Sequence, residues 1–274
     1  MAIATPLTRA ARAGDFEKVK KLVAAEANVN EKDEDGWTPL VCAAYSRNAN
    51  CVKVLVKGTR DLNAKGNGDE SALMMAAGLG SSACVEALIL AGADVNDKSK
   101  YGDTPLMWAA KGKNTKCVRA ILDAGGRINA ANDDGNTALI VASGSSDSRN
   151  IVKTLIAAGA SVNVKNKIGE TALIQAASMG NSGALALLIN AGAKVNAVDN
   201  IGDTALMRAS EGGYLECVKA LIGAKADVNA KDISGDTALR CANRSNWKDC
   251  VKYLKMHGGK QNIHSGIKIP NNIK

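Results

Sequence analysis

The sequence predicts an all-α solenoid of eight helix–turn–helix repeats joined by linkers of β-turn or hairpin type. A Thr or Ser, then Pro or Ala, then Leu recurs at positions 5, 38, 71, 104, 137, 171, 204 and 237. The step between them is 33 residues throughout, except for one step of 34. A fixed period of this length indicates a repeat architecture. Only 3% of the residues are aromatic, which suits thin layers of small side chains packed on their neighbours better than one broad core.

Residues 99–131 illustrate the first helix of a repeat. Thr104 is a favourable N-cap, and the Pro that follows it fits the first helical turn, where its missing N–H costs nothing. Leu106, Ala109 and Ala110 have the spacing of one helical face, and the two alanines allow a neighbouring helix to approach closely. Gly112 then permits a tight reversal of the chain. We therefore expect a short helix after each Thr or Ser.

The second helix of the same repeat is indicated by Val118, Ile121 and Leu122, which repeat the spacing of one helical face. Gly125 and Gly126 follow, and both can adopt the positive φ that ends a helix. The linker to the next repeat is short, polar and rich in turn residues, so it cannot form a third helix. Each repeat is thus expected to contain two helices and a turn-rich linker.

These motifs resemble the ankyrin repeat. The pattern is T-P-L-x-x-A-A, a Gly near the helix break, V-x-x-L-(I/V), and then A-G-A-(D/S/K)-V-N, with close matches at 91–96 and 158–163. The resemblance covers nearly the whole chain and implies a protein that binds partner proteins in a concave groove. One departure is systematic: apolar residues replace the His expected after T-P-L, and we expect them to pack in the core. These residues are Val41, Met74, Met107, Ile140, Ile174 and Met207.

We expect a single domain over residues 1–263 and a flexible tail over 264–274, which has no periodicity. Arg9 and Arg12 in the first repeat stand where the second repeat carries Cys42 and Tyr45, and Lys255 in the last stands where earlier repeats carry apolar residues. Solenoid ends must present polar faces to water, so these residues are expected to cap the array.

Two repeats deviate from the common pattern. The linker glycine of the third repeat is shifted by one place within residues 66–69, so this turn should be the most irregular. The fifth repeat has one extra residue in the serine-rich segment 143–148, between its helices. Insertions collect in such loops, although a contact or phosphorylation site there stays open.

The cysteines and histidines do not indicate a catalytic or metal site. Five of the seven cysteines recur at one position of their repeats, no C-x-x-C pair exists, and the only histidines are His257 and His264. Equivalent positions lie one helix layer apart, too far for a disulfide. We therefore expect buried free thiols and a reducing compartment such as the cytoplasm, while export to act elsewhere stays open. No phosphate loop or nucleophile–base pair is present, and we expect no enzyme activity, cofactor or metal.

The binding surface is expected on the first helices and the turn tips of the array. The fourth residue after each Thr or Ser varies in chemistry, as a solvent-facing position does, and it is apolar in the middle repeats, Cys42 among them. Aromatic side chains are typical binding hot spots. The sequence therefore suggests an apolar groove for a partner protein, and a monomeric scaffold or adaptor; a regulatory subunit would use the same groove. Its residues are Trp37, Tyr45, Met75, Leu79, Tyr101, Trp108 and Val141. In the alternative interpretation, Trp108 only fills space between neighbouring helices.

The C-terminal end offers a second hypothesis. Residues 240–274 contain eight Lys and Arg and one acidic residue, so they carry +7 of the net charge of +8. This end could bind an acidic protein surface, nucleic acid or anionic lipid. Nucleic acid is not favoured, because the region has few aromatic residues and no nucleic-acid motif. The candidate basic patch comprises Arg240, Arg244, Lys248, Lys252 and Lys255.

Overall fold

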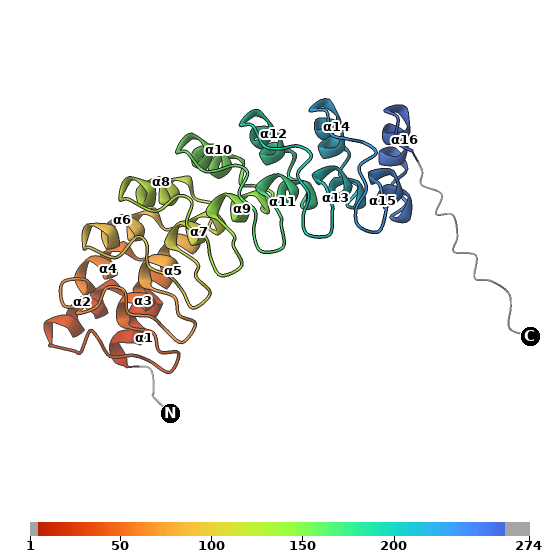
Figure 1. Ribbon diagram of the computed structural model, residues 1–274. Helices are drawn as coiled ribbons and strands as arrows, with labels where there is room; N and C mark the ends of the chain where they lie inside the picture. Colours follow the sequence, from red (N-terminus) through yellow and green to blue (C-terminus); the bar gives the residue numbers. More distant parts are fainter. Residues whose placement is uncertain (1–4, 261–274) are drawn as a thin grey trace, which may run out of the picture.

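The computed structural model describes residues 5–260, and within them the chain forms sixteen helices in two parallel rows (Figure 1). The first helix of each repeat is called an inner helix, and the second an outer helix. The inner helices are α1 (Pro6–Ala13), α3 (Pro39–Tyr45), α5 (Ala72–Gly78), α7 (Pro105–Lys111), α9 (Ala138–Ser143), α11 (Ala172–Ser178), α13 (Ala205–Glu211) and α15 (Ala238–Arg244). The outer helices are α2 (Phe16–Ala24), α4 (Ala49–Leu55), α6 (Ser82–Leu90), α8 (Thr115–Asp123), α10 (Arg149–Ala157), α12 (Ser182–Asn190), α14 (Leu215–Gly223) and α16 (Lys248–Met256).

The two rows form a curved array, as Figure 1 shows. The inner helices and the linker loops lie on the concave side, and the outer helices lie on the convex side. The predicted all-α repeat solenoid is therefore confirmed. The expected tail over 264–274 falls outside the described residues.

Each inner helix begins directly after the predicted Thr or Ser. The side-chain oxygen of that residue accepts a hydrogen bond from the backbone N–H three residues later, as between Thr204 and Met207 at 3.2 Å. Such a cap typically stabilises a helix by about 1 kcal/mol, so the recurring residue starts every repeat at a defined position. The caps are Thr5, Thr38, Ser71, Thr104, Thr137, Thr171, Thr204 and Thr237.

The core is a continuous line of small and medium-sized side chains between the two rows of helices. Leu106, Ala109 and Ala110 of α7 are buried, as are Val118 and Ile121 of α8. The six apolar residues that replace the expected His, directly after the Leu of the recurring motif, are at most 3% exposed. They pack in the core as predicted, and apolar contact replaces a polar contact from the helix to the loop.

A ladder of asparagines joins successive repeats. In each linker the side-chain oxygen of one Asn accepts a hydrogen bond from a backbone N–H of the next repeat, as Asn96 does from Arg127 at 2.8 Å. In the sequence this Asn is visible only as the last residue of the A-G-A-(D/S/K)-V-N motif, which does not indicate its role. Because the bond repeats at every junction, it fixes the spacing of the whole array. The seven residues are Asn30, Asn63, Asn96, Asn129, Asn163, Asn196 and Asn229.

The turn tips form a second ladder, through their backbones. The N–H of Asp133 donates to the carbonyl of Tyr101 at 3.0 Å, and most neighbouring tips are joined in the same way. Within the described residues no such bond joins Gly68 to Lys100. At this linker Asp69 adopts a φ of 66°, at the position where the other six linkers have a glycine. The third linker is therefore irregular, as predicted.

The extra residue of the fifth repeat lengthens the loop between α9 and α10. Helix α9 ends at Ser143, and α10 begins only at Arg149. The side-chain amide of Asn181, in the next repeat, donates to the carbonyl of Ser145 at 2.6 Å and to the hydroxyl of Ser148 at 3.2 Å. The longer loop is thus held against the sixth repeat rather than projecting freely.

Candidate binding groove

The predicted groove residues differ widely in exposure. Tyr45, Leu79 and Tyr101 are 48%, 36% and 64% exposed, so they can contact another molecule. Trp37, Trp108 and Val141 are half-buried. Met75 is only 9% exposed and Cys42 is fully buried, so the prediction that they face the groove was wrong. Neighbouring inner helices approach closely over their alanines, and side chains at this position are covered by the next repeat.

Trp37 was expected at a turn tip that no core requires, and this expectation was also wrong. Its ring packs against Tyr45, with the ring centroids 5.3 Å apart. The guanidinium of Arg12 lies 4.7 Å from the centroid of the indole ring. On another side Trp37 packs against Gly66, where a Cβ would stand 2.2 Å from the indole Cδ1. Trp37 therefore joins the first three repeats.

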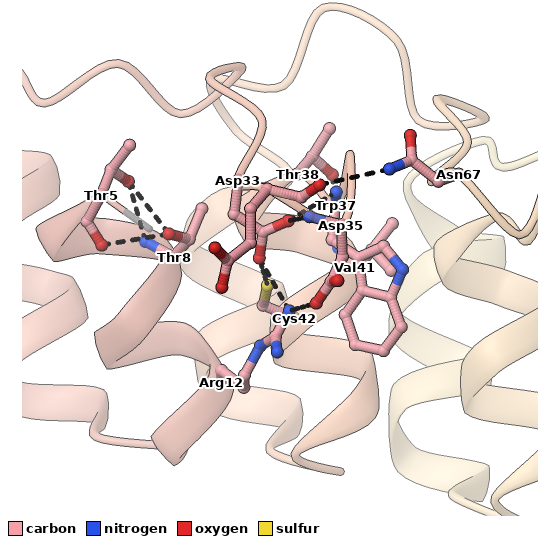
Figure 2. A network of polar contacts seen from close by, with 11 residues as sticks. Thr5, Thr8, Arg12, Asp33, Asp35, Trp37, Thr38, Val41, Cys42 and Asn67 are labelled. Carbon is pink, nitrogen blue, oxygen red and sulfur yellow. Dashed lines mark hydrogen bonds and ion pairs between the residues drawn. The ribbon is translucent and has the colours of Figure 1, made fainter. Parts of the chain in front are cut away.

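A polar network lies beside Trp37, as Figure 2 shows. Arg12 lies 2.8 Å from a carboxylate oxygen of Asp33 and also 2.8 Å from one of Asp35. The Sγ of Cys42 lies 3.7 Å from the same carboxylate of Asp33, to which it donates. Asp33 also accepts the backbone N–H groups of Asp35 and Trp37. The Arg12 predicted as a polar cap is thus part of a closed ion-pair network.

The pKa shifts in this network do not favour a nucleophilic or acid–base role for Arg12 or Cys42. The hydrogen bond to Asp35 raises the pKa of the Arg12 guanidinium, although burial opposes it, so Arg12 stays a cation. Burial raises the pKa of the Cys42 thiol to about 11, and it raises the pKa of Cys117, Cys217 and Cys241 to the same value. Because the thiolate is the nucleophile, these thiols are unreactive at neutral pH.

Trp108 lies half-buried on the groove side of α7. Its ring covers Gly78, where a Cβ would stand 2.6 Å from the indole Cε3. The ammonium of Lys111 lies 5.5 Å from the ring centroid and pairs with Asp103 at 3.0 Å. The indole N–H is buried and has no hydrogen-bond partner among the described residues. Packing between helices explains the position of the Trp108 ring, as in the alternative interpretation, but it does not explain why the indole N–H has no partner.

A hollow opens on the concave side between the fifth and sixth repeats. Its volume is about 320 Å³, and it is lined by side chains of α9 and α11 and by the linker tips. Val141 supplies apolar surface beside the buried Ile140, while Glu170 and Gln175 supply polar groups, and Ile168 stands exposed at the tip. Val141 was predicted in the groove, but the hollow beside it was not. Its walls come from two repeats, so no single repeat signals it.

The proposed basic patch does not form one surface. Arg240 and Arg244 lie on the inner helix α15, and both pair with Asp236 at 3.0 Å. Arg244 also pairs with Glu211 at 2.9 Å. The charge of both arginines is therefore paired within the chain, because the linker and the preceding repeat supply carboxylates that the local sequence pattern did not indicate.

The three lysines of the patch belong to the outer helix α16. Lys248, Lys252 and Lys255 are exposed and have no ion pair within the described residues. They line a hollow of about 340 Å³ beside Asn243 and Asn246. Within the candidate basic patch, the lysines of α16 thus carry the unpaired positive charge.

Two other aromatic residues were missed. Tyr214 and Trp247 stand at the start of outer helices, where earlier repeats have Asp, Asn or Ser, and they are 38% and 45% exposed. Trp247 donates its indole N–H to the carbonyl of Glu211 at 2.8 Å. Its role matches that of Asn114, whose side-chain amide donates to the carbonyl of Gly80. The change of residue type at a fixed repeat position could have revealed this substitution.

Residues 5–260 contain no group of three or more His, Cys, Asp and Glu that could hold a metal ion. All seven cysteines are buried and free. No helix among the described residues is long and apolar enough to cross a membrane.

The family follows from the repeat geometry and from a comparison with known families. The family model for ankyrin repeats (3 copies) matches residues 7–99, 73–166 and 145–232. The chain belongs to the ankyrin-repeat family. Ankyrin repeats are general protein–protein interaction modules and are typically non-enzymatic. No curated protein sequence matches the chain.

Proposed function

We propose that this ankyrin-repeat protein is a non-enzymatic scaffold or adaptor that binds a partner protein along its concave groove. The observation that carries the proposal is the hollow over Ile140 and Val141, with exposed Ile168 at its tip. Apolar surface framed by a few polar groups is the usual composition of a binding site. The exposed Tyr45, Leu79 and Tyr101 extend this surface towards the N-terminal repeats.

The charges of the inner helices support a neutral, contact-based groove. Arg208 on α13 lies 2.6 Å from Asp199 and 3.2 Å from Asp203, so its charge is neutralised within the chain. Arg12, Lys111, Arg240 and Arg244 are neutralised in the same way. Binding energy in the groove would therefore come mainly from desolvated aromatic and aliphatic contacts, as at other binding hot spots.

The test compares two variants as bait for proteins in a cell extract. Tyr45→Ala, Leu79→Ala and Tyr101→Ala remove exposed apolar surface from the groove side. A control variant, Leu90→Ala with Met256→Ala, removes exposed apolar surface from the outer helices. We expect a partner captured by the wild type to be retained by the second variant and to bind the first at least about tenfold more weakly.

Equal capture by both variants, in protein whose circular dichroism matches the wild type, would contradict the groove as the binding site. A catalytic role is not part of the proposal, because the buried thiols are protonated at neutral pH. Burial of all seven free thiols is also the ground on which we propose a reducing compartment for the protein.

A further inference from the structure

Positive charge is concentrated on the outer helices. These eight helices contain twelve Lys and Arg against five Asp and Glu. Within the described residues, Lys219, paired with Glu216 at 2.8 Å, is the one cation of the outer helices in a salt bridge. The inner helices differ, because most of their cations pair with carboxylates. The outer helices therefore carry more uncompensated positive charge than the inner helices.

The outer face is hollowed between α8 and α10. The hollow has a volume of about 700 Å³. Its rim carries the exposed side chains of Lys116, Arg119 and Lys153, and Asp123 is the one carboxylate that lines it. Leu122 and Ala157 contribute apolar surface. Three cations around an apolar surface match a ligand that carries both negative charge and an apolar group.

We propose that this hollow is a docking site for an acidic segment of a partner protein. Carboxylates of the segment pair with Lys116, Arg119 and Lys153, and an apolar side chain of the segment covers Leu122 and Ala157. The site lies on the opposite side of the array from the concave groove, so it is independent of the function proposed above. It would allow the chain to hold a second protein while the groove is occupied.

The chemistry of the hollow selects this occupant among the alternatives. No aromatic side chain lines it, so it offers no platform for stacking bases. Residues 261–274 of the chain itself contain Lys268 and Lys274 and no Asp or Glu, so they do not complement the charge. Lys116 and Arg119 lie three residues apart on one helix, where like charges repel. An acidic segment relieves that repulsion.

The experiment measures the affinity of a fluorescent helical peptide, with Glu on one face and Leu on the other, by anisotropy. The binding variant is Lys116→Glu, Arg119→Glu and Lys153→Glu. A matched control reverses three exposed lysines elsewhere: Lys194→Glu, Lys225→Glu and Lys231→Glu. We expect the binding variant to bind the peptide about tenfold or more weakly than the wild type does, and the control variant to bind it about twofold more weakly or less.

A third variant tests the shape of the site. Ala157→Gln fills the apolar surface and leaves every charge in place, so we expect it to weaken the peptide about threefold. If it has no effect, or if both triple variants weaken binding equally, the peptide is held by general electrostatics and the proposal is wrong. If the binding variant fails to fold, the neutral changes Lys116→Gln, Arg119→Gln and Lys153→Gln replace it.

Other occupants are measured in parallel. Tighter binding of single-stranded DNA or of phosphatidylserine vesicles than of the peptide, lost in the same variant, would overturn the proposal in favour of nucleic acid or lipid. Sedimentation that shows a dimer of the wild type and a monomer of the variant would assign the hollow to a second copy of the chain. None of these outcomes depends on the groove variants.

Discussion

The change Trp37→Ala separates structural aromatic residues from binding residues on the concave side. The Trp37 ring contacts Tyr45, Arg12 and Gly66. Truncating a fully buried aromatic residue to Ala costs about 3–5 kcal/mol. Trp37 is half-buried, so we expect a loss of about 2–3 kcal/mol in the free energy of unfolding, including about 0.5–1 kcal/mol from the lost cation–π contact. By contrast, Tyr101 is 64% exposed, and its truncation should cost about 0.5 kcal/mol or less.

The assay is unfolding in urea followed by circular dichroism, together with amide hydrogen exchange. Each repeat packs only on its neighbours, so the loss of protection in Trp37→Ala should be concentrated in the first three repeats. In contrast, Tyr101→Ala should leave protection unchanged and weaken a groove-bound partner. If Trp37→Ala left stability unchanged while Tyr101→Ala lowered it by more than about 1 kcal/mol, our assignment of the two side chains would be reversed.

Three further predictions follow from single contacts. The change Asp69→Gly should raise the free energy of unfolding, measured in urea, by about 0.5–1 kcal/mol, because φ at this position is 66°. The reverse change at the equivalent position, Gly102→Asp, should lower the free energy of unfolding, because a Cβ would stand 2.9 Å from a backbone nitrogen. A stabilising effect of Gly102→Asp would contradict this reasoning. Arg208→Ala should lower the free energy of unfolding by about 2–4 kcal/mol in the same assay, because it leaves the buried carboxylates of Asp199 and Asp203 without their cation. A loss below about 0.5 kcal/mol would show that these carboxylates are solvated. Burial raises the pKa of Cys117 and Cys217 to about 11, above that of an unfolded thiol. The stability that depends on the protonated thiols is therefore complete below about pH 8.5 and is lost as pH rises towards 11, by on the order of 1–2 kcal/mol per thiol. This loss should be smaller in a double Cys→Ala variant, and an unchanged dependence of stability on pH in that variant would exclude the thiols as the cause.

The fold was predictable because every repeat carries its own local signals. A capping Thr or Ser starts each inner helix, an apolar face marks both helices, and a glycine ends many of them. These signals come from residues near in sequence, and eight phased copies reinforce one another. The buried Met107 and its equivalents confirmed that the replaced His position is apolar and packed. The irregular third linker was predictable for the same reason, because a shifted glycine leaves Asp69 at a position that requires positive φ.

The site was only partly predictable. Tyr45, Leu79 and Tyr101 are exposed as expected, since they stand at positions off the core face. Met75 and Trp37 are not, because their exposure depends on how closely the next repeat approaches. Arg244 belongs to the basic patch predicted from the sequence. Its carboxylate partners, however, lie in the linker before α15 and in the preceding repeat.

The amino-acid sequence by itself determined the class of fold, the number and phase of the repeats, and the residues that start each helix, because these depend on interactions within a few turns of chain. Only the tertiary structure decided which apolar side chains are exposed, which cations are neutralised and where the surface is hollowed. Those properties arise between repeats, from residues about 33 positions apart that the stacking brings together. The concave groove and the cationic outer face are therefore properties of the stack, although every residue in them is visible in the sequence.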